Sequence, residues 1–370
     1  MAVKPALKLR SAPLRRVRVG FIALADCAPL LIAESLGLFA KHGVEVELMR
    51  EVGWATVREK ILYGQLDAAH AIAGLALSMR LGLDGHTANT IAPFVFNLHG
   101  NAITLSRDVW QRGVRDATML GKLIRSTNRL FTFGIVSRVS AHNFLLRRWL
   151  KSGGIDPDKD VRLVVLPPTQ MVGSLMAGLI DGYCVGEPWN SVAIEQGIGW
   201  CPAISEDLAP NHPEKILLTT EEFAQDRPVE MRALISALYE ACKFCDEMAN
   251  RAQVVSLLMD GGHLQAARAA LRASLIGPFD TGMGLKRDAE GFHIFHRNDS
   301  NTPSAQKSQW IATEFAEHGI IPKWKLTEAL QMASECWRED IFRQAIETTR
   351  TKRNPQKTPA KLRLHPTLFQ

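Results

Sequence analysis

The sequence predicts an α/β protein made of two lobes, and three observations lead to this fold class. The chain has 370 residues, which is more than one hydrophobic core usually supports. Its composition, 46% hydrophobic and 22% charged, is that of an ordinary globular protein and excludes disordered and collagen-like chains. Strand patterns alternate with helix patterns along most of the chain, as they do in parallel-sheet folds.

The first alternating unit lies near the N-terminus. Its elements are expected, in order, as a strand at 17–24, a helix at 27–43 that ends at Gly43, a strand at 44–49, a helix at 54–65 and a strand at 66–73. The strands are short apolar runs, and the helices carry apolar residues at helical spacing. This order is typical of a parallel sheet covered by helices.

A second, variant unit follows. Its elements are expected as a strand at 130–136, a helix at 140–154, a strand at 161–168, a helix at 169–180 and a strand at 181–189. From about residue 211 the pattern changes to longer helices, such as 228–251 and 267–274. We therefore predict a second lobe inserted into the first: tail 1–16, lobe 1 at 17–107 and 205–348, lobe 2 at 108–204, and tail 349–370.

The net charge of +6 comes from the two ends of the chain. Residues 1–18 hold six Lys or Arg and no acid, and residues 350–370 hold another six and no acid. The ends therefore carry +12, and the body between them carries 6 − 12 = −6. Basic ends of this kind are usually solvated tails, so direct nucleic-acid binding is not expected.

The six cysteines form no regular framework for a disulfide-rich protein. Cys242 and Cys245 have the spacing of half a zinc site, but they lie in a helical pattern with no second pair at a matching distance. Buried thiols are the better interpretation. Neither a metal nor a cofactor is expected.

The stretch "RRVRVGFIALADC" superficially resembles a lipoprotein signal. Its apolar run, from Val19 to Ala25, has only seven residues, and Asp26 stands where a small residue should precede Cys27. Residues 17–24 are better explained as the first strand of the fold. Since the rest of the chain has no apolar run near eighteen residues, we expect a cytoplasmic protein without a membrane span.

Polar and aromatic side chains follow the predicted strands at their carboxyl ends. In open α/β sheets, ligands bind beyond these strand ends, in the cleft between lobes. The residues found there are Trp54, Asn101, His142, Thr169, Gln170, Glu187 and Trp189. They are the first candidates for a binding site.

Several phrases of the sequence resemble a known family. They are "IAESLGLFAKHGVEVEL", "GWATVREKILYGQLDAAHA", "HNFLLRRWLKSGGIDPDKDV", "LPPTQMVGSLMAGLIDGYCVGEPWN" and "NHPEKILLT". They are similar to the nitrate and bicarbonate binding proteins of ABC transporters, and equally to the related cytoplasmic nitrate/nitrite sensors of the NasS type. The resemblance runs in register from Val17 to Phe223 and more weakly to about residue 345. It implies a fold of the two-lobed periplasmic-binding-protein type II, with a small anion held in the cleft.

The resemblance also implies which residues form the ligand pocket. The positions that match the family's pocket are Trp54, His142, Val185, Glu187 and Lys215. Asn101 stands where transporter members are expected to have glutamine, and Thr169 stands where a third proline is expected. Both changes are polar and modest. They leave the choice among nitrate, nitrite and bicarbonate open.

The chemistry of these residues suits a planar monovalent anion, which needs about one cation and several neutral donors when it is buried. Lys215 is expected to supply the charge, and Asn101, Thr169 and His142 to supply hydrogen bonds. Trp54 is expected to close one face of the pocket. The loop "VGEPWN" then forms a wall in which Val185 packs near the anion and Glu187 orients neighbouring donors.

Each of these residues also has an ordinary interpretation when it is taken alone. Lys215 would be a surface lysine near a helix start, Trp54 a core residue and Glu187 a turn acid. The match across five separated motifs is what favours a ligand site.

The sensor branch of the family implies a partner. The protein would hold an RNA-binding antiterminator when nitrate is absent and release it when nitrate binds. The alternative is the substrate-binding component of a nitrate or bicarbonate ABC transporter. A third class, an enzyme of the kind that makes the thiamine pyrimidine, would need Cys184 as nucleophile with His142 and Glu187 beside it. No nucleotide-binding glycine motif is found, and no catalytic residue is predicted.

Overall fold

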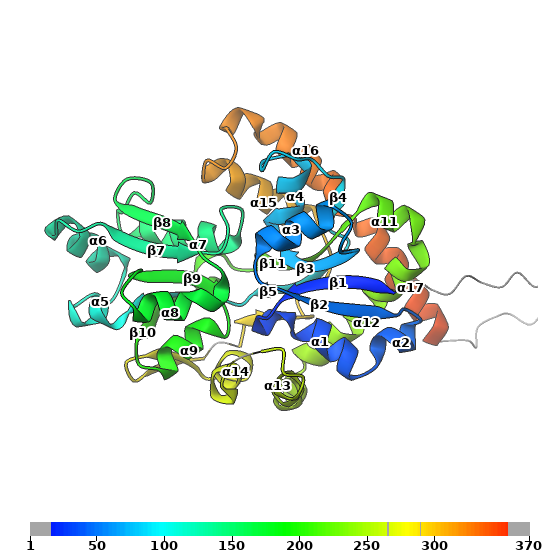
Figure 1. The fold of residues 1–370 in the computed structure, drawn as a ribbon, viewed down its shortest axis with the longest axis horizontal. Coiled ribbons are helices and arrows are strands. Elements are labelled where there is room, and N and C mark those ends of the chain that lie inside the picture. Colours follow the sequence, from blue (N-terminus) through cyan, green and yellow to red (C-terminus); the bar gives the residue numbers. More distant parts are fainter. Residues whose placement is uncertain (1–15, 265, 289, 354–370) are drawn as a thin grey trace, which may run out of the picture.

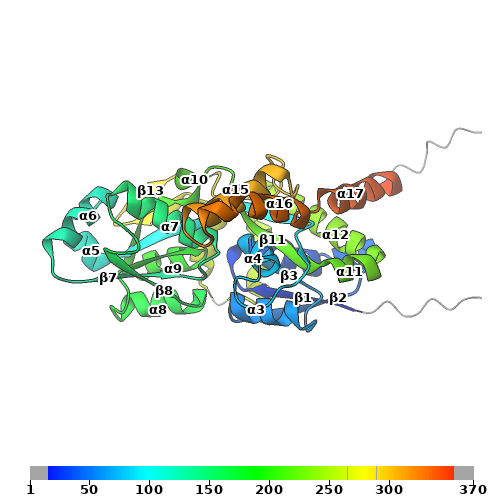
Figure 2. The ribbon, with the colours of Figure 1, turned by 90° about the horizontal axis from the view of Figure 1, so that it is seen from above.

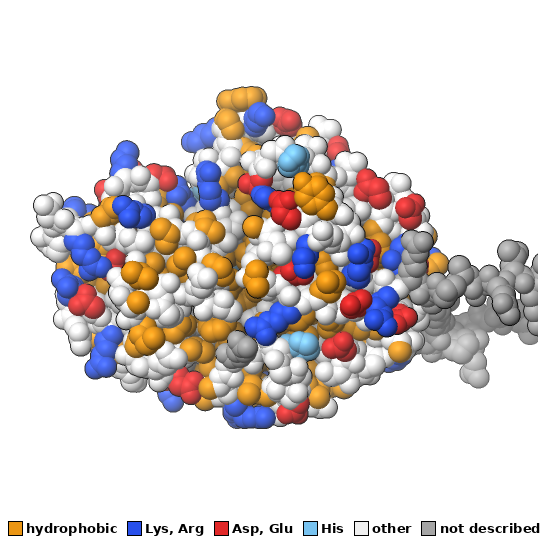
Figure 3. All heavy atoms as spheres, viewed as in Figure 1, with side chains coloured by type: hydrophobic (Ala, Val, Ile, Leu, Met, Phe, Trp, Pro, Cys, Tyr) orange, Lys and Arg blue, Asp and Glu red, His pale blue; other side chains and the backbone are white. Residues whose placement is uncertain are grey.

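The computed structural model describes residues 16–264, 266–288 and 290–353, which form two lobes side by side (Figure 1). The predicted tails, 1–16 and 349–370, fall outside these residues except for Arg16 and the end of the last helix. None of the described helices is long and apolar enough to cross a membrane. Charged side chains of both signs are scattered over the face shown in Figure 3.

The first lobe is built on a mixed sheet with the order β14-β5-β11-β3-β1-β2, in which β4 also pairs with β11. The strands are β1 (Val17–Ile22), β2 (Val46–Glu51), β3 (Ala68–Ile72), β4 (Thr90–Ile91), β5 (Val95–His99), β11 (Pro213–Thr220) and β14 (His293–Ile294). β1 runs parallel to β2 and β3, which confirms the predicted first unit. β11 runs antiparallel to both of its main neighbours, β3 and β5.

The second lobe is built on a five-stranded sheet with the order β10-β6-β9-β7-β8. The strands are β6 (Asn101–Ser106), β7 (Phe131–Ile135), β8 (Val161–Val165), β9 (Gly182–Gly186) and β10 (Gly199–Ile204). The chain enters this lobe between β5 and β6 and leaves it after β10. β6 pairs with β9 and β10, so residues 101–106 belong to the second lobe. The sequence pattern had led us to expect them in the first lobe, with the boundary after residue 107.

Helices cover both faces of the first sheet. The helices of this lobe are α1 (Ala28–Ser35), α2 (Leu38–His42), α3 (Trp54–Leu62), α4 (Gly74–Arg80), α11 (Glu221–Asp226), α12 (Pro228–Asp246), α13 (Arg251–Asp260), α15 (Ala305–Glu317), α16 (Leu326–Cys336) and α17 (Glu339–Arg353). The predicted helix at 27–43 is divided into α1 and α2. Gly37 adopts a left-handed conformation with φ of 65° between them, and this conformation interrupts a helix.

The second lobe has shorter helices. They are α5 (Arg107–Gln111), α6 (Ala117–Ser126), α7 (Ala141–Ser152), α8 (Met171–Met176), α9 (Trp189–Glu195) and α10 (Ser205–Leu208). Short 3₁₀ turns add η1 (Ala25–Cys27), η2 (Pro168–Gln170), η3 (Met248–Asn250) and η4 (Lys323–Lys325). Trp189 begins α9 instead of ending a strand, because the predicted strand at 181–189 stops at Gly186.

Strand β11 is the largest difference from the sequence prediction. The sequence pattern after residue 211 predicts helices, yet residues 213–220 form a strand in the interior of the first sheet, and Pro213 to Thr219 are all buried. A strand that is covered on both faces shows no alternation of polar and apolar residues. The adjacent charged residues Glu214 and Lys215 also make the segment unlike the apolar run that is typical of a buried strand.

The two lobes are in contact over a shared apolar core. Side chains of α3, α4 and α15 in the first lobe belong to the same buried cluster as Phe144, Met171 and Val185 of the second. Figure 2 shows α15 lying across the junction. In α15, Glu314 pairs with Arg148 of α7, and Phe315 packs edge-on against Phe144 with ring centroids 6.0 Å apart.

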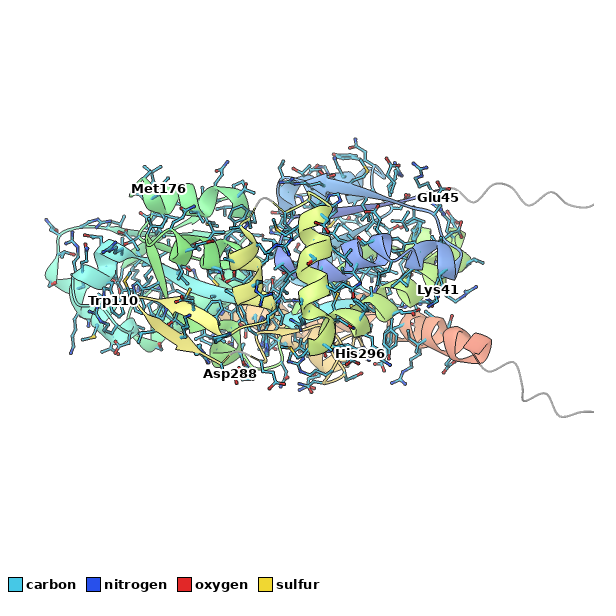
Figure 4. All side chains as sticks on the ribbon, turned by 90° about the horizontal axis from the view of Figure 1, so that it is seen from below. Lys41, Glu45, Trp110, Met176, Asp288 and His296 are labelled. Atoms are coloured by element: carbon cyan, nitrogen blue, oxygen red, sulfur yellow. The ribbon has the colours of Figure 1, made fainter. Side chains whose placement is uncertain are left out.

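A late segment of the chain returns to the second lobe. Helix α14 (Arg268–Leu275) packs on α9, and the hairpin of β12 (Phe279–Gly282) and β13 (Leu285–Arg287) packs on β10. Figure 4 shows this hairpin at the end of the molecule where Trp110 and Asp288 lie, far from Lys41 and Glu45. The chain therefore crosses between the lobes twice more, before α14 and after β13.

Candidate functional site

Five buried polar residues from both lobes converge at the lobe junction. Asp26 of η1, Glu214 and Lys215 of β11 come from the first lobe, whereas Asn101 of β6 and His142 of α7 come from the second. Each of the five is at most 1% exposed. We call them the buried cluster.

Lys215 lies between two carboxylates. Its Nζ atom is 2.7 Å from Asp26 Oδ2 and 2.6 Å from Glu214 Oε1. The same Nζ lies 5.7 Å from the centre of the Trp54 ring, within the range of a cation–π contact. Burial alone would lower the pKa of Lys215, but the two carboxylates raise it. The side chain is therefore a charged ammonium.

Glu214 connects the two lobes through its two oxygens. Oε1 is 3.0 Å from His142 Nε2, and Oε2 accepts a hydrogen bond of 2.6 Å from Asn101 Nδ2. Burial alone would raise the pKa of Glu214, but Lys215 and His142 hold it well below its usual range. Glu214 is therefore an ionised carboxylate that only accepts hydrogen bonds.

This state of Glu214 determines the tautomer of His142. Because a carboxylate cannot donate, His142 Nε2 must carry the hydrogen of the bond that the two residues share. Burial lowers the pKa of His142, so the ring is neutral at pH 7. Its second nitrogen, Nδ1, is then a lone-pair acceptor, and it has no hydrogen-bond partner among the described residues.

Other buried polar atoms of the predicted site residues also lack partners. Within the described part of the chain, Trp54 Nε1, Asn101 Oδ1 and Glu187 Oε1 are buried and form no hydrogen bond. A buried polar atom left unpaired costs about 1–3 kcal/mol. The indole N–H of Trp54 is a donor that a bound anion can accept from, whereas the two oxygens are acceptors and need a donor.

Gly186 leaves room beside these atoms. A Cβ atom at this position would lie 3.4 Å from Asn101 Oδ1 and 3.6 Å from Asp26 Oδ2. These are ordinary contact distances, so a methyl group fits there without displacing its neighbours. The missing side chain therefore provides space at the end of β9, next to the buried cluster.

The loop "VGEPWN" forms the adjoining wall. Val185 is buried in the core shared by the lobes, and its carbonyl accepts a hydrogen bond from Asn190 Nδ2 at 2.8 Å. Glu187 accepts the backbone N–H of Ser191 at 3.2 Å through Oε2, and its backbone carbonyl accepts the N–H of Ala25 at 2.7 Å. Burial raises the pKa of Glu187 to about 7. The loop thus holds the second lobe against η1.

The structure brings most of the predicted site residues together. Asn101, His142 and Lys215 belong to the buried cluster, and Trp54 lies over Lys215. Val185 and Glu187 form the neighbouring wall. Thr169 is different: it is exposed in η2, and among the described residues it has no hydrogen bond to the cluster. The ligand contacts of all seven residues remain predictions.

Sequence reasoning missed three members of the site, namely Asp26, Glu214 and Gly186. Asp26 follows the first strand directly, and this position is a signal for a ligand site in an open α/β sheet. It was considered only as part of a possible export signal.

Two further buried histidines also lie near Asp26: His70 Nε2 is 3.6 Å from its Oδ1, and both ring nitrogens of His293 are unpaired within the described residues.

The carboxylates change the expected role of Lys215. We expected its charge to be available to an anion, but two buried acids already share it. Asp26, Glu214 and Lys215 together carry a formal charge of −1. A bound anion therefore needs more than the single cation that the sequence suggested.

The enzyme alternative depends on Cys184 as a nucleophile. This residue is buried in the core of the second lobe, and burial raises the pKa of its thiol well above the usual range. The thiolate is the nucleophilic form of cysteine, so this environment disfavours the reaction. Cys242 and Cys245 are likewise buried, as predicted.

The chain is similar to curated proteins whose names describe the transport of nitrate or bicarbonate. The chain is 38% identical over 338 residues to the nitrate import ATP-binding protein NrtC of Synechocystis sp. PCC 6803, covering 88% of this chain and 49% of the relative. It is 36% identical over 309 residues to the bicarbonate transport ATP-binding protein CmpC of Synechococcus elongatus, covering 83% and 46%. The chain thus spans about half the length of these relatives.

Comparison with solved structures confirms the predicted two-lobed fold. The crystal structure of the periplasmic nitrate-binding protein NrtA from Synechocystis PCC 6803 superposes with a TM-score of 0.86 at 26% identity, covering 94% of this chain and 93% of that one. Residues 10–259 match the model of the NMT1-like family. Since this match spans more than half of the 370 residues, the chain belongs to the NMT1-like family.

Proposed function

We propose that this protein binds one small monovalent anion, nitrate or nitrite, at the buried cluster between its lobes, without transforming it. The observation that carries the proposal is a buried indole N–H, that of Trp54, which has no partner among the described residues and lies beside the buried Lys215 ammonium at the point where both lobes meet. The names of the relatives, which include nitrate import and nitrate binding, support nitrate as the ligand.

The donors available to such an anion come from both lobes. The indole N–H of Trp54 in the first lobe has no partner among the residues that the structure describes, and the Lys215 ammonium has three hydrogens for two carboxylate partners. Asn101 of the second lobe uses one hydrogen of its amide for Glu214, and a second remains. An anion that contacts residues of both lobes favours the closed arrangement over an open one.

Nitrate and nitrite are each expected to bind one-to-one and to raise the melting temperature. Nitrate has four heavy atoms and gains about 6 kcal/mol at about 1.5 kcal/mol per atom, which corresponds to a Kd of tens of micromolar, whereas nitrite has three and gains about 4.5 kcal/mol, a Kd of roughly half a millimolar. At a hundredfold excess over Kd, the native state gains about 2.7 kcal/mol. Thermal melts with millimolar sodium nitrate or nitrite measure this gain, and sodium chloride at equal concentration is the control. An identical melt in all three salts would count against the site.

Gly186→Ala is expected to weaken anion binding by at least about tenfold, which corresponds to 1.4 kcal/mol. The new methyl group would occupy the space beside Asn101 Oδ1 and Asp26 Oδ2 at ordinary contact distances, so the fold should be retained. Gly173→Ala is the matched control, because a Cβ atom at that position has no neighbour within 4 Å. Calorimetric titration measures both variants. Normal nitrate affinity in Gly186→Ala would place the ligand elsewhere.

We further propose that the protein acts in the cytoplasm as a sensor for nitrate-assimilation genes. In this role it holds an RNA-binding antiterminator protein when the anion is absent and releases it when the anion binds. The support is the resemblance of the sequence to the sensor branch, together with a candidate site that is built from residues of both lobes. The test is retention of the antiterminator by the immobilised chain in nitrate-free buffer.

A transport role is the second candidate, and the names of the relatives favour it, since they describe nitrate import and bicarbonate transport. In that role the chain would deliver the same anion to a membrane permease. Cell fractionation and pull-down separate the two roles. Recovery outside the cytoplasm together with a permease would support transport, whereas cytoplasmic recovery with the RNA-binding protein would support the sensor.

A further inference from the structure

The buried cluster carries excess negative charge before any anion binds. Asp26 and Glu214 contribute two negative charges, and Lys215 contributes one positive charge. The nearby histidines do not compensate: burial lowers the pKa of His70 to about 4 and that of His293 to about 3. Adding nitrate would bring the formal charge to −2 in a space closed to water. Buried charges without partners are very costly.

The free nitrogen of His142 has the wrong polarity for an anion. Its Nε2–H is directed to Glu214, which leaves Nδ1 as a lone pair. The oxygens of nitrate and nitrite only accept hydrogen bonds, so they repel this lone pair. A proton on Nδ1 would reverse the interaction, because the imidazolium donates from both nitrogens.

We propose that the anion binds together with one proton, and that this proton is taken up on Nδ1 of His142. The proposal rests on the proposed anion-binding function. The proton comes from the solvent buffer, which is left as its conjugate base, and no covalent bond to the anion is made. The buried cluster then returns to a charge of −1 with the anion bound, the same as in its empty state.

The groups that face His142 support this assignment. From β11 it faces Glu214 and Lys215, and from η1 it faces Asp26. Two acids and one cation therefore surround the ring, and their net negative charge favours the imidazolium. A bound anion adds a further negative charge, which offsets the cost of burying the charged ring. Asn101 of β6 is uncharged.

His212 is the other histidine next to Glu214. Its Nδ1 lies 2.7 Å from the carbonyl of Ala209, and its Nε2 lies 3.5 Å from Glu214 Oε2. A proton on Nε2 of His212 would face Glu214 and would not be available to a ligand. His142 is therefore the histidine whose protonation follows anion binding.

The expected consequence is a pH-dependent affinity whose sign follows from linkage. The pKa of His142 is lowered in the empty protein and is raised by the bound anion. Between these two pKa values, binding takes up one proton, so the Kd of nitrate rises by up to about tenfold for each pH unit. Affinity should be nearly constant below the lower pKa and should fall steadily from pH 7 toward pH 8.

The test is calorimetric titration of the full chain with sodium nitrate at pH 7, with EDTA present, in PIPES and in Tris, two buffers of different ionisation enthalpy. The dependence of the binding heat on the ionisation enthalpy of the buffer gives the number of protons taken up per bound nitrate. A value close to one is expected. His142→Gln should reduce this number toward zero. His318→Gln is the matched control, since His318 Nε2 lies 3.1 Å from Glu314 Oε2 and its Nδ1 is also unpaired among the described residues; it should behave like the wild type.

A second measurement covers the case in which His142→Gln does not fold or bind. The ¹⁵N shift of His142 Nδ1 in the wild-type protein should move from the lone-pair range to the protonated range when nitrate is added. Binding of nitrate with no buffer dependence and an unchanged Kd from pH 6.5 to 8.5 would overturn the proton coupling alone. Uptake that persists in His142→Gln would overturn the assignment to His142 and would point to another group, such as His212 or Glu187, since burial raises the pKa of Glu187 to about 7. Absence of nitrate binding at any pH would instead reject the proposed function.

Discussion

Lys215→Ala is expected to lower the free energy of unfolding by roughly 3–5 kcal/mol, the usual cost of removing one partner from a buried ion pair. The substitution leaves Asp26 and Glu214 buried without the ammonium that lies 2.7 Å and 2.6 Å from them. From the sequence alone, the same substitution would be expected to abolish anion binding and leave the fold intact, because Lys215 was assigned only to the ligand. Urea unfolding measures the difference.

Two further variants test whether the missing ammonium causes the lower free energy of unfolding of Lys215→Ala. Lys41→Ala removes another lysine ion pair, with Nζ 2.6 Å from Glu240 Oε1, but the Lys41 side chain is 53% exposed, so a loss of less than about 1 kcal/mol is expected. Adding Asp26→Asn to Lys215→Ala removes one of the two uncompensated charges and should recover part of the stability. A free energy of unfolding for Lys215→Ala within about 1 kcal/mol of the wild type would show that the carboxylates do not depend on Lys215.

Nitrate is expected to release the antiterminator gradually over tens to hundreds of micromolar. If the partner holds the open form, nitrate and partner oppose each other, and each weakens the other's binding by the same factor. A change from nearly all bound to nearly all free needs about 5.5 kcal/mol of coupling. That is close to the whole affinity of about 6 kcal/mol expected for a four-atom ligand, so a sharp switch is not expected.

A pull-down of the antiterminator with the immobilised chain across a nitrate series measures this release. The Gly186→Ala variant is the matched control: it should keep its partner at nitrate concentrations that release the partner from the wild type. Gly173→Ala should release it normally. A complex that saturating nitrate and nitrite leave unchanged would reject the sensor role, and the transport role would then be the stronger proposal.

The sequence by itself was sufficient for the alternating α/β order, and it indicated three of the residues that lie together at the lobe junction. Strands such as Val17–Ile22 and Phe131–Ile135 are short apolar runs between turn signals, so local pattern alone identifies them. The resemblance to binding proteins pointed to Asn101, His142 and Lys215, which the structure brings together. The strands were predicted correctly because periodicity is a property of neighbouring residues, and the ligand contacts of the three site residues stay predictions.

The tertiary structure alone decided the electrostatics of the site and the position of β11. That strand shows no alternation because β3 and β5 flank it and helices cover both faces of its sheet. Lys215 meets Asp26, a residue of the first unit, only because β11 joins the sheet that β1 begins. Likewise, the polar residue Thr169 was expected at the ligand but is exposed. Burial and charge pairing depend on residues far apart in the chain, and no local pattern in the sequence contains them.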